Sequence, residues 1–117
     1  MAVPDSFRDR VMTDLEPLGD IRARAMFGGY GIFEDGDMFG LLSGSALFFK
    51  IGEGNRAAFE AVGAEQFNQM PYFRVPDSVL DDAALLQEWT HAAIEVAHEA
   101  ARKRKRKSSR HFPPGAL

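Results

Sequence analysis

Two Glu-x-x-His pairs carry the residue types best suited to metal chemistry. Glu88 precedes His91, and Glu95 precedes His98, by three residues, a spacing that supplies metal ligands from one helical face in di-iron helix bundles. With about 3.6 residues per turn, the four side chains form one helical stripe. That stripe lies opposite the apolar positions of the same segment, so it faces water, whereas a bundle site needs a buried interior. We therefore predict a solvated helix face that binds neither a metal nor a cofactor.

The remaining polar residues form no recognisable catalytic set. Nucleophilic catalysis needs a Ser, Thr or Lys beside a base, and the third histidine, His111, lies in a polar tail. Asp35 with Asp37 fits a hairpin turn, and Asp81 with Asp82 fits a helix start, where carboxylates favour the turn and the helix dipole. We therefore predict that the protein is not an enzyme.

The glycines and aromatic residues have structural interpretations. Gly28-Gly29-Tyr30-Gly31 has the composition of a phosphate-binding loop, but such a loop precedes a helix, and here strand-like segments lie on both sides. A turn or a bulge is the better interpretation. Aromatic rings can also stack on nucleic-acid bases. Because these aromatics lack basic neighbours and sit in alternating, strand-like contexts, we assign them to core packing: Phe27, Tyr30, Phe33, Phe39, Phe48 and Phe49.

Charge divides the chain into an acidic body and a basic end. Residues 1–101 hold seven bases and 17 acids, a net charge of −10, whereas residues 102–117 hold seven bases and no acid. Such a basic run can neutralise nucleic-acid phosphates, but the acidic body repels phosphates over a screening length of about 8 to 10 Å. We therefore expect at most a weak, sequence-independent contact with nucleic acid, through Arg102, Lys103, Arg104, Lys105, Arg106, Lys107 and Arg110.

Length and composition bound the class of protein. The 117 residues suffice for one domain with one core, and the lack of cysteine excludes disulfides and thiolate metal sites. No segment reaches the roughly 18 to 20 apolar residues that span a bilayer, and acids occur where a signal peptide needs an apolar run. We expect a cytoplasmic protein that does not enter the membrane. Its ordered domain should cover residues 4–103, and residues 104–117 should form a basic, disordered tail.

Hydrophobic spacing and turn residues predict a helix followed by antiparallel strands. Apolar residues between positions 7 and 18 form one helical face after Pro4. The sequences Asp35-Gly36 and Ser43-Gly44-Ser45 are typical of hairpin turns. Strand candidates lie on either side of these turns, at residues 21–27, 30–34, 38–42 and 47–51.

The second half of the chain predicts a short helix and an edge strand. The helix covers residues 53–62, buries Phe59 and Val62, and ends at Gly63 in a left-handed conformation. Residues 70–75 form a strand that contains a proline, and the missing N–H of proline favours the edge of a sheet.

The longest predicted helix runs from about residue 81 to at least residue 101. Its apolar stripe comprises Leu85, Trp89, Ala92, Ala93, Val96 and Ala100. The element order is helix, three or four strands, helix, strand and helix, which indicates an α+β fold rather than an alternating α/β fold. We predict two layers, in which the long C-terminal helix packs on one face of an antiparallel sheet and Trp89 is buried between them.

Several motifs in a fixed order make the chain similar to one known family. They are Met26–Phe33, Asp35–Phe39, Leu47–Lys50, Asn55 with Phe59, Pro71–Pro76, and Leu86 with Trp89 and Ala93. Over residues 5–103 this set resembles the N-terminal domain of the TfoX family. The resemblance implies a compact α+β domain and an association with the regulation of natural DNA uptake in some bacteria. Regulatory TfoX proteins carry a further helical domain, so we expect a stand-alone N-terminal domain here.

These inferences favour a regulatory or protein-interaction module over an enzyme. On the last helix, Ile94 projects away from the predicted Trp89 stripe, and we expect a strip of small and apolar residues around it to contact a partner. This strip comprises Thr90, Ile94, Ala97 and Ala101. A homodimer through the strip or through an exposed sheet edge is one form of this contact. The alternative is a nucleic-acid-associated protein that binds non-specifically through its basic tail.

Overall fold

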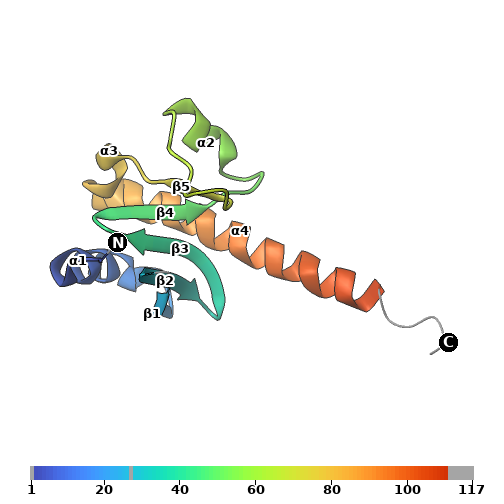
Figure 1. Cartoon of the computed structure of the whole chain (residues 1–117). Helices are drawn as coiled ribbons and strands as arrows, with labels where there is room; N and C mark the ends of the chain where they lie inside the picture. Colours follow the sequence, from blue (N-terminus) through green and yellow to red (C-terminus); the bar gives the residue numbers. More distant parts are fainter. Residues whose placement is uncertain (1, 27, 111–117) are drawn as a thin grey trace.

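The computed structural model describes residues 2–26 and 28–110, with side chains described as far as residue 106. This part of the chain folds into a sheet and helices in the predicted order, with one further short helix after the last strand (Figure 1). The elements are α1 (Asp5–Leu15), the 3-10 helix η1 (Glu16–Leu18), β1 (Ile21–Met26), β2 (Gly29–Glu34), β3 (Asp37–Ser43), β4 (Ala46–Lys50), α2 (Arg56–Ala61), β5 (Tyr72–Arg74), α3 (Asp77–Leu80) and α4 (Ala83–Arg110).

The strands form one antiparallel sheet in the order β1-β2-β3-β4-β5, so each strand pairs with its neighbours in the sequence. Tight turns impose this order. Asp35 and Gly36, between β2 and β3, have φ angles of 50° and 85°, the left-handed values of a two-residue hairpin turn. Gly44 has a φ angle of 58° and lies in the turn between β3 and β4. β5 lies at the sheet edge, as predicted, although it begins only after Pro71, and the predicted α+β fold is confirmed.

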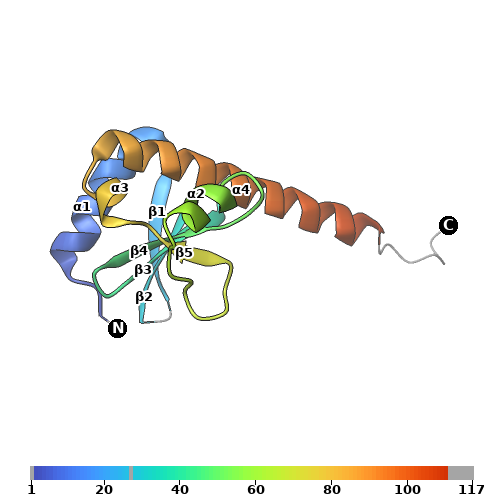
Figure 2. The ribbon, with the colours of Figure 1, turned by 90° about the horizontal axis from the view of Figure 1, so that it is seen from above.

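The main core lies on the inner face of the sheet, the face that α4 covers. Leu42 from β3 and Phe49 from β4 pack in one buried cluster with Val11 and Leu15 of α1 and with Leu86 of α4. Each of these side chains is at most 1% exposed. Figure 2 shows α4 running across one side of the sheet, which gives the two predicted layers.

A β-bulge in β3 decides which residues face which side of the sheet. The register shifts between Ile32 and Phe33 of β2, because Phe39 of β3 is an extra residue without a partner opposite. The shift reverses the alternation of the residues that follow. Leu41 therefore turns to the outer face, while Leu42 joins the main core.

The outer face carries a second, smaller apolar cluster. Leu41, Phe48 and Tyr72 are buried there, beneath Phe67 and Met70 from the segment between α2 and β5. The rings of Phe48 and Phe67 meet edge-on, with centroids 4.9 Å apart. The segment between α2 and β5 thus covers part of the outer face over β3, β4 and β5.

α4 packs on the sheet with a different face from the predicted one. The buried face is displaced by about one residue, because Thr90, a polar residue that we assigned to the exposed strip, is fully buried. Its hydroxyl donates to the backbone carbonyl of Leu86 at 2.6 Å, so its polar group is satisfied within the helix. Leu85, which we placed in the buried stripe, is 38% exposed instead. The residues of α4 that are buried are Leu86, Thr90, Ala93, Ile94 and Ala97.

α2 and its surroundings confirm some details and correct others. Phe59 is 1% exposed and Gly63 has a φ angle of 64°, both as predicted. Val62 is 51% exposed, so the prediction that it is buried is wrong; α2 ends at Ala61, and Val62 stands in the turn beyond. Trp89 is half-buried rather than buried against the sheet, since its ring packs edge-on against Phe59 of α2 with centroids 4.8 Å apart.

α4 continues as a helix to Arg110, where we expected a disordered tail from residue 104. Lys and Arg are good helix formers, and they extend a helix that packing has already fixed. This end of α4 projects beyond the sheet in both Figure 1 and Figure 2. Residues 111–117 lie outside the described residues. Within the described part of the chain, neither this helix nor any other is long and apolar enough to cross a membrane.

Candidate interaction surfaces

The predicted contact strip on α4 is not exposed at the surface of the domain. Thr90, Ile94 and Ala97 are 0%, 7% and 3% exposed, because they form the face that α4 packs on the sheet. Ala101 is half-buried. The prediction that this strip contacts a partner is therefore wrong, and a homodimer through it has no surface to use. Of the two routes to a homodimer, only an exposed sheet edge remains as a prediction.

His98 does not lie on a solvated face, contrary to the sequence interpretation. Its Nδ1 atom is 2.6 Å from Oδ2 of Asp37, and its Nε2 atom is 2.5 Å from Oε1 of Glu34. Only the imidazolium form can donate to both carboxylates. The hydrogen bond with Asp37 is the main cause that raises the pKa of His98; the bond with Glu34 adds to the rise, and burial opposes both. The ring therefore serves as a charged bridge between α4 and the β2–β3 hairpin.

The other histidine of the predicted stripe does lie in solvent. His91 pairs with Glu95 at 3.3 Å, and both side chains are at least 66% exposed. Within the described residues, no three acidic or histidine side chains are placed to hold a metal ion. Local sequence could not reveal the His98 bridge, because its carboxylate partners come from a hairpin 61 and 64 residues away.

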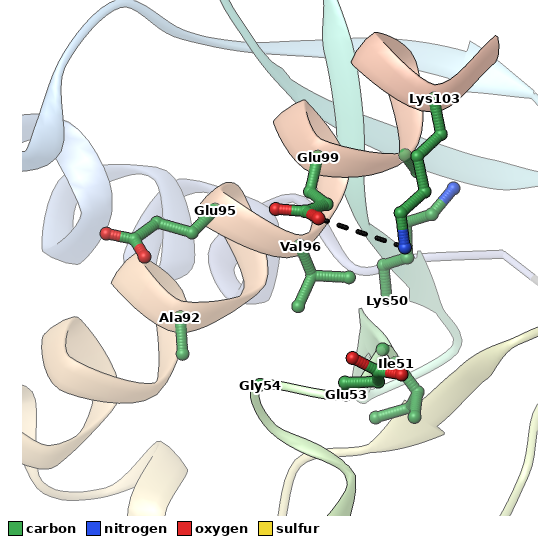
Figure 3. A pocket seen from close by; sticks show the side chains of 11 residues that line it. Lys50, Ile51, Glu53, Gly54, Ala92, Glu95, Val96, Glu99 and Lys103 are labelled. Carbon is green, nitrogen blue, oxygen red and sulfur yellow. Dashed lines mark ion pairs between the residues drawn. The ribbon is translucent and has the colours of Figure 1, made fainter. Parts of the chain in front are cut away.

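A groove of about 470 Å³ lies between α4 and the loop after β4 (Figure 3). Gly52 lets the loop approach the helix, since a Cβ atom there would lie 2.8 Å from Cγ1 of Val96. The rim carries both signs of charge, including Lys50 and Glu53, and Nζ of Lys103 pairs with Oε1 of Glu99 at 3.8 Å. Because its charges are mixed and partly paired, the groove favours no single class of ligand.

Four basic side chains of the strands lie on the outer face of the sheet. In the strand register, Arg22 is opposite Phe33, Arg24 is opposite Gly31, and Phe48 is opposite Arg74, so these residues share one face. We call Arg22, Arg24, Lys50 and Arg74 the cationic face. They are four of the seven bases in residues 1–101.

The acids of the strands lie on the other side. Glu34 of β2 pairs with Asp37 of β3 across the register, and both bind His98 of α4. The strands therefore separate their charges, with carboxylates toward the helix layer and cations toward the outside. Alternation along Arg22-Ala23-Arg24 could have placed two of the cations on one face from the sequence. The positions of Lys50 and Arg74 on that face could be assigned only from the strand register, which includes the bulge at Phe39.

The centre of the open part of this face is apolar. A Cβ atom on Gly31 would lie 2.7 Å from Sδ of Met26, 2.9 Å from Sδ of Met38 and 3.1 Å from Cε1 of Phe33, so these half-buried side chains close over the glycine. The guanidinium carbon of Arg24 lies over the Phe33 ring, 5.1 Å from its centroid. The expectation that the aromatics lack basic neighbours is thus wrong for Phe33, and also for Tyr30, over whose ring Arg8 lies at 5.2 Å.

The basic end of α4 starts beside the cationic face. Arg102 and Lys103 pair with Glu99 of the preceding turn, at 3.5 Å and 3.8 Å. Burial lowers the pKa of Lys50 and the charge of Arg104 lowers it further, whereas the carboxylate of Asp37 opposes this shift. The exposed side chains at positions 102–106 include Lys105 and Arg106; those of Lys107 and Arg110 lie outside the described side chains.

Comparison with known proteins supports the resemblance seen in the motifs. The family model for the TfoX N-terminal domain matches residues 13–97. The chain belongs to the TfoX N-terminal domain family. In this TfoX N-terminal domain, the matched residues run from α1 through the whole sheet to the buried part of α4. They include the cationic face and exclude the basic end of α4.

One curated relative of this TfoX N-terminal domain is the DNA transformation protein TfoX1 of Aliivibrio fischeri. The two are 28% identical over 93 residues, which is 79% of this chain and 44% of TfoX1. The chain therefore spans less than half the length of that relative. The family predicted from the motifs is confirmed, and what the whole of TfoX1 does is a separate matter from what this domain does.

Proposed function

We propose that this TfoX N-terminal domain is a cytoplasmic, non-enzymatic module that regulates DNA uptake by binding another protein. Family membership and the name of TfoX1 support the link to DNA transformation. The cationic face supports the binding role. It is the observation that carries the proposal.

The cationic face contrasts in charge with the rest of the domain. Residues 1–101 carry a net charge of −10, yet four of their seven bases lie on the outer face of the sheet, two of them on the edge strand β1 and two on β4 and β5. Cations distributed for solubility alone would be interspersed with the acids. Exposed arginines next to half-buried apolar side chains, as on β1 and β2, are typical of a recognition surface, where charge steers the encounter and apolar contact holds the partner.

A transformation assay in the bacterium that encodes the chain tests this proposal. A strain that lacks the chain should change its transformation frequency, and the wild-type chain should restore it. The double variant Arg22→Glu with Arg24→Glu should restore it roughly tenfold less well, because two reversed charges oppose the partner. Arg56→Glu is the matched control, since Arg56 is an exposed base on α2 whose partner is Glu60. A deletion without effect on transformation, or full rescue by the double variant, would contradict the proposal.

The basic end of α4 favours a second candidate function, non-specific binding to nucleic acid. Its exposed bases at positions 102–106 stand on a helix that projects from the body, which frees them to approach a phosphate backbone. With seven phosphate contacts at most, the slope of log K against log salt for duplex DNA should be no steeper than roughly −6. Changing Arg102, Arg104 and Arg106 to Gln should remove most of the binding. Binding that survives this change, or that prefers one duplex sequence more than about tenfold, would contradict it.

A further inference from the structure

We propose that the cationic face binds an acidic peptide segment that carries apolar side chains, presented by a partner protein. The inference rests on the proposed protein-binding function and names the chemistry of the partner at that same surface. The part of the face over β1 and β2 offers both arginines and apolar side chains to this ligand.

The arginines of β1 would bind the carboxylates of the segment. The side chain of Arg22 is 79% exposed, and its partner is Asp20, at 3.1 Å and 67% exposed. Such surface pairs are weak and exchange readily for a ligand carboxylate. Arg24 and Arg74 are also exposed. Arginine is suited to this role, because its planar group can donate two parallel hydrogen bonds to one carboxylate.

A hollow of about 350 Å³ adjoins these arginines at the end of the β1–β2 pair. Arg22, Arg24 and Phe33 line it, together with Asp20 and Asp35. The two carboxylates lie at the end of the face next to the β2–β3 turn, where they would repel an acidic ligand, so the ligand is limited to the part of the face over the strands. This placement favours a short segment that lies along β1 and β2 rather than one that continues past the hairpin turn.

Met26, Met38 and Phe33 would bind the apolar side chains of the segment. The three side chains close over Gly31 and remain half-buried, so part of their apolar area meets water. Methionine side chains are flexible and polarizable, and they adapt to partners of different shape. A purely acidic ligand would leave this area in water, whereas a segment that carries acidic and apolar residues on the same side can contact the arginines and the methionines together, because same-side positions in an extended segment are two residues apart.

Nucleic acid fits this face less well than a peptide. Binding of single strands depends on aromatic rings that stack on bases, but Phe48 and Tyr72 are 6% and 3% exposed, and Arg24 already lies over Phe33. A long polyanion would also extend past the face onto a body of net charge −10. A short acidic segment can stay within the face and avoid that repulsion.

Fluorescence anisotropy with the full chain tests the inference. The probe is a labelled peptide of about 12 residues in which pairs of Glu follow pairs of Leu or Met, so that each side of the extended segment carries both acidic and apolar residues, and its length suits a segment along two strands. The wild-type chain should bind it, and Arg22→Glu with Arg24→Glu should weaken binding about tenfold or more. Arg56→Glu should bind like the wild type. A probe with Ser in place of Leu and Met should also bind more weakly, about tenfold, because the methionines lose their contacts.

The outcomes separate the inference from the proposed function. Circular dichroism checks that each variant is folded, which we expect because Arg22 and Arg24 are exposed. If the peptide fails to bind while the transformation assay still depends on Arg22 and Arg24, the ligand class is wrong and the regulatory function stands. If the peptide binds as expected but transformation is indifferent to these residues, the binding site stands and the proposed function fails. Tighter binding of an oligothymidine of about 12 nucleotides, lost in the same double variant, would overturn the inference in favour of single-stranded nucleic acid.

Discussion

His98 joins two elements that lie 61 residues apart in the sequence, through its contact with Asp37. Folding raises the pKa of His98, chiefly through the Asp37 hydrogen bond, so the folded state holds this proton more tightly than the unfolded state. The stabilisation should be fully present below the unfolded pKa of about 6.5 and should be lost as the pH rises through the folded pKa. The ring is 26% exposed, which makes the contribution modest, about 1 kcal/mol.

Urea unfolding at a series of pH values between about 5 and 9 measures this effect. The free energy of unfolding should fall with rising pH in the wild type, and His98→Gln should flatten that fall. His91→Gln is the matched control, since His91 lies on the same helix and is 66% exposed. An equal pH dependence in His98→Gln and in the wild type would show that the bridge does not stabilise the fold.

Two glycines of β2 differ in what a side chain would meet. A Cβ atom on Gly29 would lie 2.0 Å from the carbonyl oxygen of Leu42, which is backbone and cannot move aside. A Cβ atom on Gly31 would meet the far ends of Met26 and Met38, which can rotate away. Thermal unfolding should therefore show that Gly29→Ala destabilises by about 3 kcal/mol and Gly31→Ala by about 1 kcal/mol. Equal losses would contradict the close approach at Gly29.

At the scale of elements, the sequence predicted what local chemistry decides. Asp35-Gly36 specifies a hairpin turn wherever it stands between strands, so the strand boundaries followed from it. The bulge at Phe39 depends on how β3 fits against β2, and no local signal marks it. No local signal marks the buried face of α4 either. The apolar Leu85 suggested that its own face is buried, whereas the face that packs on the sheet contains Thr90 with its buried hydroxyl. Only the packed sheet decides between two candidate faces of one helix.

The true face of α4 has a direct test. Ile94 is 7% exposed in the main core, so Ile94→Glu should bury an unpaired carboxylate and destabilise the domain by about 3 to 5 kcal/mol. Leu85 is 38% exposed, so Leu85→Glu on the same helix should cost less than about 1 kcal/mol. Chemical denaturation of both variants measures the difference. A stable, folded Ile94→Glu domain would restore the exposed strip that the sequence suggested.

At the scale of the whole molecule, the net charge of each part could be predicted from the sequence, but the positions of the charged side chains only partly. Counting residues showed an acidic body and a basic end. It did not show that the basic end is helical as far as Arg110, nor that four cations of the body share one sheet face. Both facts depend on packing. The helix α4 is fixed by the face that it packs on the sheet, and the strand register, which includes the bulge, decides which side chains share a face. The candidate binding surface was therefore invisible before the sheet was assembled.

The separated charges predict how the molecules behave toward each other. α4 carries its basic end away from a body of net charge −10 (Figure 2), so the end of one molecule can attract the body of another. The contact joins two different surfaces, which favours open, head-to-tail association over a closed dimer. At about 10 mM salt the screening length is about 30 Å, and at 150 mM it is about 8 Å, so association should appear at low salt and vanish at physiological salt.

Sedimentation velocity across this salt range measures the association. The variant with Arg102, Arg104 and Arg106 changed to Gln should stay monomeric at low salt, because three of the seven bases at that end are removed. Arg22→Gln with Arg24→Gln is the control, since it removes bases from the sheet and leaves the helix end intact. Association that persists at about 0.5 M salt would contradict the electrostatic account, because charges on the surface are then largely screened. It would point instead to an apolar or hydrogen-bonded interface, for which the exposed edge strand β1 is the available surface.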